Sequence, residues 1–407
     1  MSSAHPLRHL AVYLGSSIST AAIGFGSVLV LTRMLAPSDY GLIGVFFSLL
    51  AFVAPVVSLS ADGLIAVNKS TLNQAAYLAF QRSYIALAYT CFAALQMLFV
   101  LVWLAGGYSE GLLVGAPLFG LVRFLAGMAA TEYVVEQRSV TFGMLTVATS
   151  LFSLLLTVLF ITALGAWGGW RVLAMFAADL LMLSVRYRGR LGLLVRPHWD
   201  RTQLQPILSF GLPSLVAVAG GWALNEADKL IVAREAGMHL AGIYAAAAAL
   251  AGIMMTFNQA LTNAFYPEMF RRFADNSHCV GRIVRRYLLI FVTLALCFCA
   301  VVLGAYLLVA DLLLPPRYTG GRNVFVALML AGVAVSFYRP FGLLAEYMKW
   351  GQRRAVAITV GGMVTVIVGV SGVRLGGLLW APAGIAAGYL CAALVLAAGL
   401  RQRRESL

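Results

Sequence analysis

The stretch LTRMLAPSDYGLIGVFFSLL, residues 31–50, aligns with VAREAGMHLAGIYAAAAALA, residues 232–251, about half the chain further on. The identical pairs are Arg33 with Arg234, Gly41 with Gly242 and Leu49 with Leu250. Each stretch follows one long apolar segment and leads into the next. This placement predicts a duplicated chain that folds as two similar halves. The alternative for the glycine pair is that each glycine only caps a tight turn.

The composition is that of a membrane protein. Of the 407 residues, 61% are hydrophobic and 11% are charged, and the mean hydropathy is +0.90. A soluble domain has about 25% charged residues. The apolar runs are close to the roughly 20 residues that a helix needs to cross a bilayer, and they show no period-two alternation. We therefore expect an all-α polytopic membrane protein.

We expect about twelve transmembrane helices by this length rule. The expected ranges are 10–32, 41–60, 83–105, 111–131, 143–163, 165–185, 208–233, 241–265, 287–308, 323–344, 355–373 and 379–400.

The positive charge is distributed unevenly between the predicted loops. The net charge is +14, and most of the 29 lysines and arginines fall on one side of the predicted helices. Because positively charged loops stay in the cytoplasm, both termini and the central loop are predicted to be cytoplasmic. The basic residues would contact anionic membrane lipid, so the charge does not require a nucleic-acid partner.

The most polar stretch, RYRGRLGLLVRPHWDRTQLQP, divides the chain near its middle. We expect an N-terminal six-helix bundle over 1–185, a cytoplasmic amphipathic linker over 186–206 and a C-terminal six-helix bundle over 207–407. An even number of helices in each half gives both halves the same orientation. Such parallel repeats are related by an axis along the membrane normal and enclose a central cavity.

These motifs resemble the polysaccharide-transport branch of the multidrug/oligosaccharidyl-lipid/polysaccharide flippase superfamily. That branch typically carries an L-x-P-x-x-Y-G pattern before its second helix, matched here by Leu35, Pro37, Tyr40 and Gly41. The segments SFGLPSLVAV (209–218) and AGIYAAA (241–247) are similar to its G-L-P and G-x-Y motifs. The sequence departs from the related lipid II flippases, which usually have fourteen helices.

The resemblance implies a Wzx-type flippase. Such a protein moves undecaprenyl-pyrophosphate-linked oligosaccharide, the repeat unit of O-antigen or a related surface polysaccharide, from the cytoplasmic to the periplasmic leaflet. It would lie in the bacterial inner membrane as a multi-pass protein and serve lipopolysaccharide biosynthesis. Polysaccharide polymerase and chain-length proteins are candidate partners, and H⁺ or Na⁺ is the candidate coupling ion.

Ionisable residues inside membrane helices are costly and usually functional. Arg123 lies in the fourth predicted span and Arg339 in the tenth, which are corresponding helices of the two halves. A guanidinium offers a fork of donors that fits phosphate oxygens, so both arginines are predicted to bind the pyrophosphate. The alternatives are snorkelling to an interface or pairing with a carboxylate.

Small polar residues are candidates for contact with sugar. Ser16 and Thr20 lie near one face of the first predicted helix, and Asn258 lies in the eighth. Close packing of helices explains small residues at such positions equally well.

The segment LNEADKL, residues 224–230, places charges inside the seventh predicted span. On a continuous helix, Trp222, Asn225 or Glu226, and Lys229 would form one stripe. Glu226 and Lys229 would pair at i, i+3, which leaves Asp228 as the net negative charge. One hypothesis is that Asp228 or Glu226 binds the coupling ion, while Lys229 and Asn225 bind substrate. The alternative is a neutral polar patch that only fixes helix packing.

Other functions fit the sequence less well. No phosphate-binding loop and no cluster with metal-ligand spacing is visible, so we expect no enzyme, no cofactor and no metal. A polysaccharide polymerase or ligase usually carries a large external loop, and none is predicted here. An ion-coupled drug or metabolite antiporter of the same superfamily remains open. A scaffold subunit would have little use for the intramembrane charges.

Overall fold

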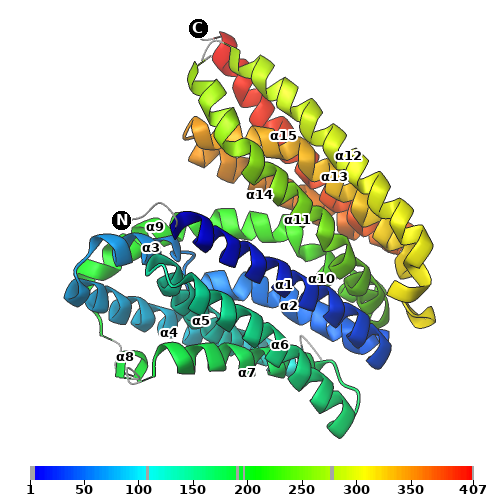
Figure 1. The fold of residues 1–407 in the computed structure, drawn as a ribbon. Helices are drawn as coiled ribbons and strands as arrows, with labels where there is room; N and C mark the ends of the chain where they lie inside the picture. The colour runs from blue at the N-terminus through cyan, green and yellow to red at the C-terminus, as the bar shows by residue number, and fades with distance from the viewer. Residues whose placement is uncertain (1–4, 107–109, 189–191, 196–197, 276–278, 406–407) are drawn as a thin grey trace. The chain divides into compact units, whose positions relative to one another are not determined.

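The computed structural model describes residues 5–106, 110–188, 192–195, 198–275 and 279–405, and most of them lie in helices (Figure 1). The expected all-α architecture is confirmed. The chain divides into two compact units. The first comprises the residues up to Leu35 and Phe46–Val218, and the second comprises Ala36–Val45 and Ala219–Leu407. Helices α2 and α9 therefore contribute to both units.

The first unit is built from long helices and short connecting ones. Its helices are α1 (His5–Met34), α2 (Pro37–Val57), α3 (Gly63–Thr71), α4 (Gln74–Leu104), the 3-10 helix η1 (Gly111–Gly115), α5 (Ala116–Val135), α6 (Ser139–Leu164), α7 (Gly169–Arg186), α8 (Gly192–Val195) and α9 (Arg201–Asn225). Helix α6 packs against α1 and α7, and α5 packs against α4 and α7. Its core is centred on buried aromatic side chains, among them Phe80, Tyr84 and Phe124.

The polar stretch after α7 packs against this unit. The hydroxyl of Tyr89 donates a hydrogen bond of 2.8 Å to the carbonyl oxygen of Leu194 in α8. Leu204 and Ile207, near the start of α9, are buried in the same core. The stretch expected to be a linker is therefore held against the first unit by these contacts. Its cytoplasmic position and the division at 1–185, 186–206 and 207–407 stay predictions.

The second unit contains the remaining helices. They are α10 (Ala227–Ala236), α11 (Met238–Asp275), α12 (Val280–Leu313), the 3-10 helix η3 (Pro316–Tyr318), α13 (Gly321–Tyr347), α14 (Gly351–Gly376), the 3-10 helix η4 (Leu378–Trp380) and α15 (Ala381–Glu405). Helix α13 packs against α11, α12 and α15, and α14 packs against α10 and α15. A second aromatic core holds Phe273 and Phe291 where α11, α12 and α13 meet.

The two aligned glycines lie side by side within the second unit. A Cβ atom on Gly41 would overlap the carbonyl oxygen of Met238, and one on Gly242 would overlap the carbonyl oxygen of Pro37. Neither glycine has a positive φ. The interpretation as turn caps is therefore wrong, because these positions require glycine for the close approach of the starts of α2 and α11.

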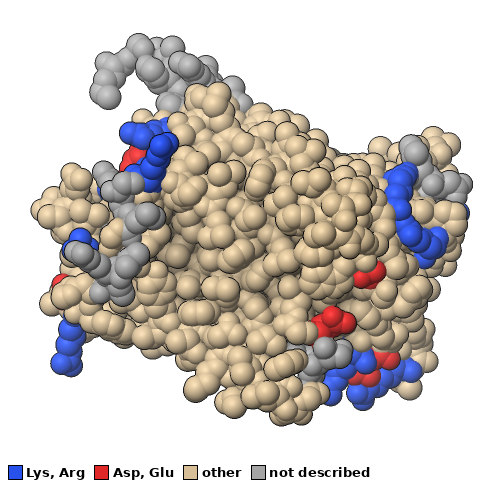
Figure 2. Space-filling model, turned by 90° about the horizontal axis from the view of Figure 1, so that it is seen from below, with Lys and Arg blue, Asp and Glu red and all other residues tan. Residues whose placement is uncertain are grey.

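Eleven helices among the described residues are long and apolar enough to cross a membrane. Helix α7 occupies the place of the expected span 165–185, but its 18 residues include Arg171, Asp179 and Arg186. Large apolar side chains such as Leu155 of α6 and Leu307 of α12 are exposed. On the face drawn in Figure 2, wide areas carry no charged side chain. A lipid environment accounts for these exposed apolar side chains, because an apolar surface of this extent is unfavourable in water.

The seventh predicted span is not one continuous helix, which corrects the expectation for 208–233. Helix α9 ends at Asn225, and α10 begins at Ala227. Between them, Glu226 has φ −130° and ψ −20°, outside the helical range. The side-chain amide of Asn225 donates to the carbonyl oxygen of Gly221 at 2.7 Å, which supplies a partner for the backbone near the break. The single stripe predicted from Trp222 to Lys229 therefore does not form on a regular helix.

Candidate functional site

The residues of LNEADKL form a polar cluster in the second unit, which we call the α10 cluster (Asn225, Glu226, Asp228, Lys229). The Nζ atom of Lys229 lies 2.9 Å from Oε2 of Glu226 and 3.4 Å from Oδ1 of Asp228. The predicted pair between Glu226 and Lys229 is thus confirmed. The Asp228 side chain is 3% exposed, so its carboxyl group must find its hydrogen-bond partners within the protein.

Neighbouring helices complete the α10 cluster. The hydroxyl of Tyr244 in α11 donates to Oδ2 of Asp228 at 2.7 Å. The hydroxyl of Tyr389 in α15 donates to Oδ1 of Asn225 at 2.6 Å. Two tyrosines therefore fix the acceptors on either side of the helix break, and the three charged side chains keep a formal charge of −1.

Other predicted site residues lie elsewhere in the two units. In the second unit, Arg339 donates to Oε1 of Gln259 at 3.2 Å. Asn258 is fully buried; its amide donates to the carbonyl oxygens of Met254 and Gly332, and it accepts from Ser336 at 2.6 Å. Asn258 thus joins α11 to α13, and its role in sugar binding stays a prediction.

In the first unit, Arg123 of α5 pairs with a carboxylate. Its Nη1 atom lies 2.9 Å from Oδ1 of Asp179 in α7, while the arginine side chain remains 53% exposed. Ser16 donates to the carbonyl oxygen of Tyr13 at 3.0 Å. The hydroxyl of Thr20 is buried without a partner among the described residues. Carboxylate pairing, one of the two alternatives for Arg123, therefore occurs, and exposure leaves part of the guanidinium accessible.

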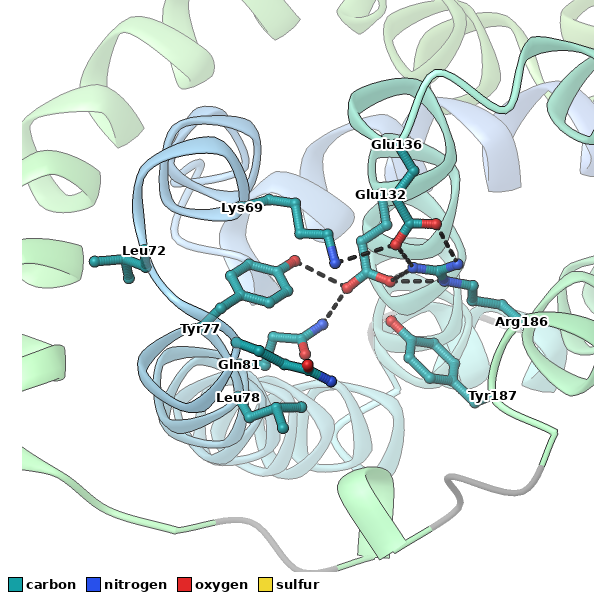
Figure 3. Close-up of a pocket in the computed structure, with 10 residues that line it drawn as sticks. Lys69, Leu72, Tyr77, Leu78, Gln81, Glu132, Glu136, Arg186 and Tyr187 are labelled. Carbon is teal, nitrogen blue, oxygen red and sulfur yellow. Dashed lines mark hydrogen bonds and ion pairs between the residues drawn. The ribbon is translucent and has the colours of Figure 1, made fainter.

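A second polar site lies in the first unit, and the sequence reasoning missed it. We call it the α5–α7 cluster (Lys69, Glu132, Glu136, Arg186); it borders a cavity of about 340 Å³ (Figure 3). Arg186 donates from Nε to Oε2 of Glu132 at 2.7 Å and holds Glu136 with two bonds of 2.7 and 3.0 Å. Lys69 of α3 lies 3.1 Å from Glu136.

Further groups satisfy the buried carboxylate of this cluster. Tyr77 donates to Oε1 of Glu132 at 2.8 Å, and the amide of Gln81 donates to the same oxygen. The guanidinium of Arg186 also lies over the ring of Tyr133, 4.6 Å from its centroid. Glu132 is 3% exposed, and its carboxylate oxygens receive hydrogen bonds from α4 and α7.

Two properties of the α5–α7 cluster matter for its chemistry. Hydrogen bonds from Arg186 lower the pKa of Glu136 to about 2, and Lys69 adds to this effect. The four charges balance, so the cavity wall has no net charge. The hydroxyl of Tyr187, at the cavity edge, is buried and has no partner among the described residues (Figure 3).

The signal for this site was weak in the sequence. Glu132 and Glu136 stand at i, i+4 near the end of one apolar span, and Arg186 ends another. Charges near span ends usually reflect topology, so nothing marked these three residues as partners. Among the described residues, no group of three or more His, Cys, Asp or Glu side chains is placed to hold a metal ion.

Comparison with known structures identifies the fold. A multidrug-resistance MATE transporter of the MOP superfamily, in an inward-facing conformation, superposes with a TM-score of 0.74 at 14% identity, covering 95% of this chain and 94% of its own. The lipid II flippase MurJ superposes with a TM-score of 0.69 at 10% identity, covering 96% and 87%. No curated protein matches the sequence significantly.

The family follows from a sequence model. The model described as "Polysaccharide biosynthesis protein" matches residues 30–319, which is most of the chain. This match includes both aligned stretches, the α10 cluster and the α5–α7 cluster. The chain therefore belongs to the polysaccharide biosynthesis protein family, and it has the fold shared by MATE transporters and MurJ.

Proposed function

We propose that the chain is a flippase that moves undecaprenyl-pyrophosphate-linked oligosaccharide from the cytoplasmic to the periplasmic leaflet by alternating access. The observation that carries this proposal is the family match over residues 30–319, joined to a fold that also serves a lipid II flippase. A carrier of a charged, hydroxylated head group needs ionisable groups within its membrane helices. Both units supply them, at Arg123 and at the α10 cluster among others.

The proposed setting follows the sequence expectations. The protein would lie in the bacterial inner membrane with both termini cytoplasmic. It would supply repeat units for O-antigen or a related lipopolysaccharide component. Polysaccharide polymerase and chain-length proteins are its proposed partners, and the neighbouring structures are transporters, which fits a protein that catalyses no covalent step.

We assign the predicted roles as follows. Arg123 and Arg339 bind the pyrophosphate, since part of the Arg123 guanidinium is exposed and Arg339 is held by a neutral partner, Gln259, and not by a carboxylate among the described residues. Ser16, Thr20 and Asn258 remain candidates for sugar contact, and Asn225 and Lys229 remain candidates for substrate binding. Asp228 and Glu226 are the proposed ion-coupling groups, since discontinuous membrane helices commonly form ion sites in transporters and intramembrane carboxylates commonly carry protons.

Reconstitution tests the transport step directly. Proteoliposomes would carry an undecaprenyl-pyrophosphate oligosaccharide in the inner leaflet, and a membrane-impermeant glycosidase outside would report each molecule that crosses. We expect the wild-type protein to increase the exposed fraction over protein-free vesicles. Arg339→Ala should abolish most of the increase, and Arg339→Lys should restore part of it, because an ammonium keeps the charge but loses the fork. Equal rates with and without protein would contradict a flippase.

The similarity to a MATE transporter favours a second candidate function, an ion-coupled drug or metabolite antiporter. The same vesicles can be loaded with a fluorescent cationic dye under an imposed pH or Na⁺ gradient. Dye efflux without oligosaccharide flipping would replace the proposed function with this one. Asp228→Asn and Glu226→Gln would lose gradient dependence under either function.

A further inference from the structure

The ammonium of Lys229 is placed where a metal cation would be expected. It lies between the carboxylates of Glu226 and Asp228, at 2.9 and 3.4 Å. The Lys229 side chain is 18% exposed, and the Asp228 side chain is 3% exposed. Two carboxylates at one helix break are the kind of oxygen donors that hard cations prefer. Here the chain supplies the cation itself.

The surrounding contacts keep this arrangement in place. Tyr244 donates to Oδ2 of Asp228 at 2.7 Å, and Oδ1 of the same carboxylate faces Lys229. Tyr389 holds Asn225 on the other side of the break. A sodium ion that entered between the carboxylates would lie within a few ångströms of the ammonium, and like charges at that distance repel strongly when partly buried.

We propose that Lys229 is a built-in substitute for a monovalent metal ion. Glu226 and Asp228 form a cation site that the lysine fills permanently, so the second unit binds no Na⁺ at this position. While both carboxylates hold the ammonium, Lys229 is not available to a pyrophosphate, so this inference removes Lys229 from the proposed substrate-binding residues. For ion coupling, a consequence that rests on the proposed function, the exchanged ion at this site would be H⁺ and not Na⁺.

The inference can be tested by emptying the site. Lys229→Met removes the charge while keeping an unbranched side chain of similar length. For the purified wild-type protein in detergent, we expect the same thermal unfolding temperature in NaCl and in choline chloride at equal ionic strength. For Lys229→Met, NaCl should raise the unfolding temperature by a few degrees relative to choline chloride, because a bound ion stabilises the folded state. Radioactive sodium should bind to the variant and not to the wild type.

Two double variants are the controls. Lys229→Met with Asp228→Asn removes the most buried ligand and should lose the response to Na⁺. Lys229→Met with Glu226→Gln keeps Asp228 and should respond more weakly than Lys229→Met; both double variants keep the wild-type net charge of the cluster. The variant with Glu226→Gln also serves as the accessible variant if the added negative charge prevents Lys229→Met from accumulating.

The outcomes separate this inference from the transport proposal. Sodium binding by the wild type that disappears in Asp228→Asn would overturn the inference. Equal behaviour of Lys229→Met in both salts would overturn it as well. If only Lys229→Met with Glu226→Gln can be purified, the lack of any response to Na⁺ in that variant would overturn it. None of these measurements requires transport, so a chain that flips no lipid can still pass or fail them.

Discussion

The α5–α7 cluster and the α10 cluster combine the same groups in different ways. Each places a buried carboxylate beside a cation and a tyrosine hydroxyl. In the first, one guanidinium from α7 bridges a carboxylate in the last turn of α5 and a carboxylate directly after that helix. In the second, the charges are adjacent in the chain, and one tyrosine of α11 reaches them. The first cluster therefore ties several helices together through its ion pairs, whereas the charges of the second lie at one helix break and reach α11 through a single hydrogen bond.

This difference predicts that charge removal is most costly in the α5–α7 cluster. Arg186→Ala leaves Glu132 and Glu136 without their shared cation, and breaking a buried pair in this way costs about 3–5 kcal/mol. Denaturant unfolding of the purified protein in detergent measures the loss. Arg188→Ala, at an exposed neighbouring arginine, is the matched control and should change stability little. Equal stability of both variants would remove the structural role of this cluster.

In the α10 cluster we expect a smaller effect from a single change. Tyr244→Phe removes the hydroxyl that donates to Asp228, and a hydrogen bond to a charged group contributes about 1.5–3 kcal/mol. The same unfolding measurement applies. Tyr266→Phe, at an exposed position of the same helix, should lower stability by a few tenths of a kcal/mol at most. A loss for Tyr244→Phe as large as that for Arg186→Ala would erase the contrast between the two clusters.

The two clusters also differ in how far the sequence predicted them. Glu226 and Lys229 are three residues apart, so helix geometry alone predicted their contact. Glu132 and Arg186 are separated by 54 residues, and their contact depends on which helices lie side by side. Hydropathy predicted the membrane helices but treated 208–233 as one segment, because an average over a window does not register the single non-helical residue Glu226. The motif around Gly41 predicted the family, while the close approach to α11 required coordinates.

The pH dependence of stability should reflect the α5–α7 cluster. Arg186 and Lys69 lower the pKa of Glu136 to about 2, from a usual value of 4.5. A lowered carboxyl pKa stabilises the fold above the unfolded value, and this contribution is lost as the pH falls from about 4.5 towards 2. We expect Glu136→Gln to flatten the unfolding profile in this range. Glu110→Gln, at the residue before η1, is the control and should leave the unfolding profile as steep as in the wild type. A profile that stays steep in Glu136→Gln would mean that another group titrates in this range.

The smallest effect is expected at the cavity edge. The hydroxyl of Tyr187 is buried and has no hydrogen-bond partner within the described part of the chain, whereas the hydroxyl of Tyr84, in the same core, donates to the carbonyl oxygen of Ser58 at 2.7 Å. A buried polar group that lacks a partner costs free energy, so Tyr187→Phe should leave stability unchanged or raise it, while Tyr84→Phe should lower it by about 1 kcal/mol. If Tyr187→Phe is instead as destabilising as Tyr84→Phe, the hydroxyl has a partner in the cavity, such as an ordered water molecule. The cavity beside the α5–α7 cluster would then hold water, and the cluster would bind solvent in addition to joining helices through its ion pairs.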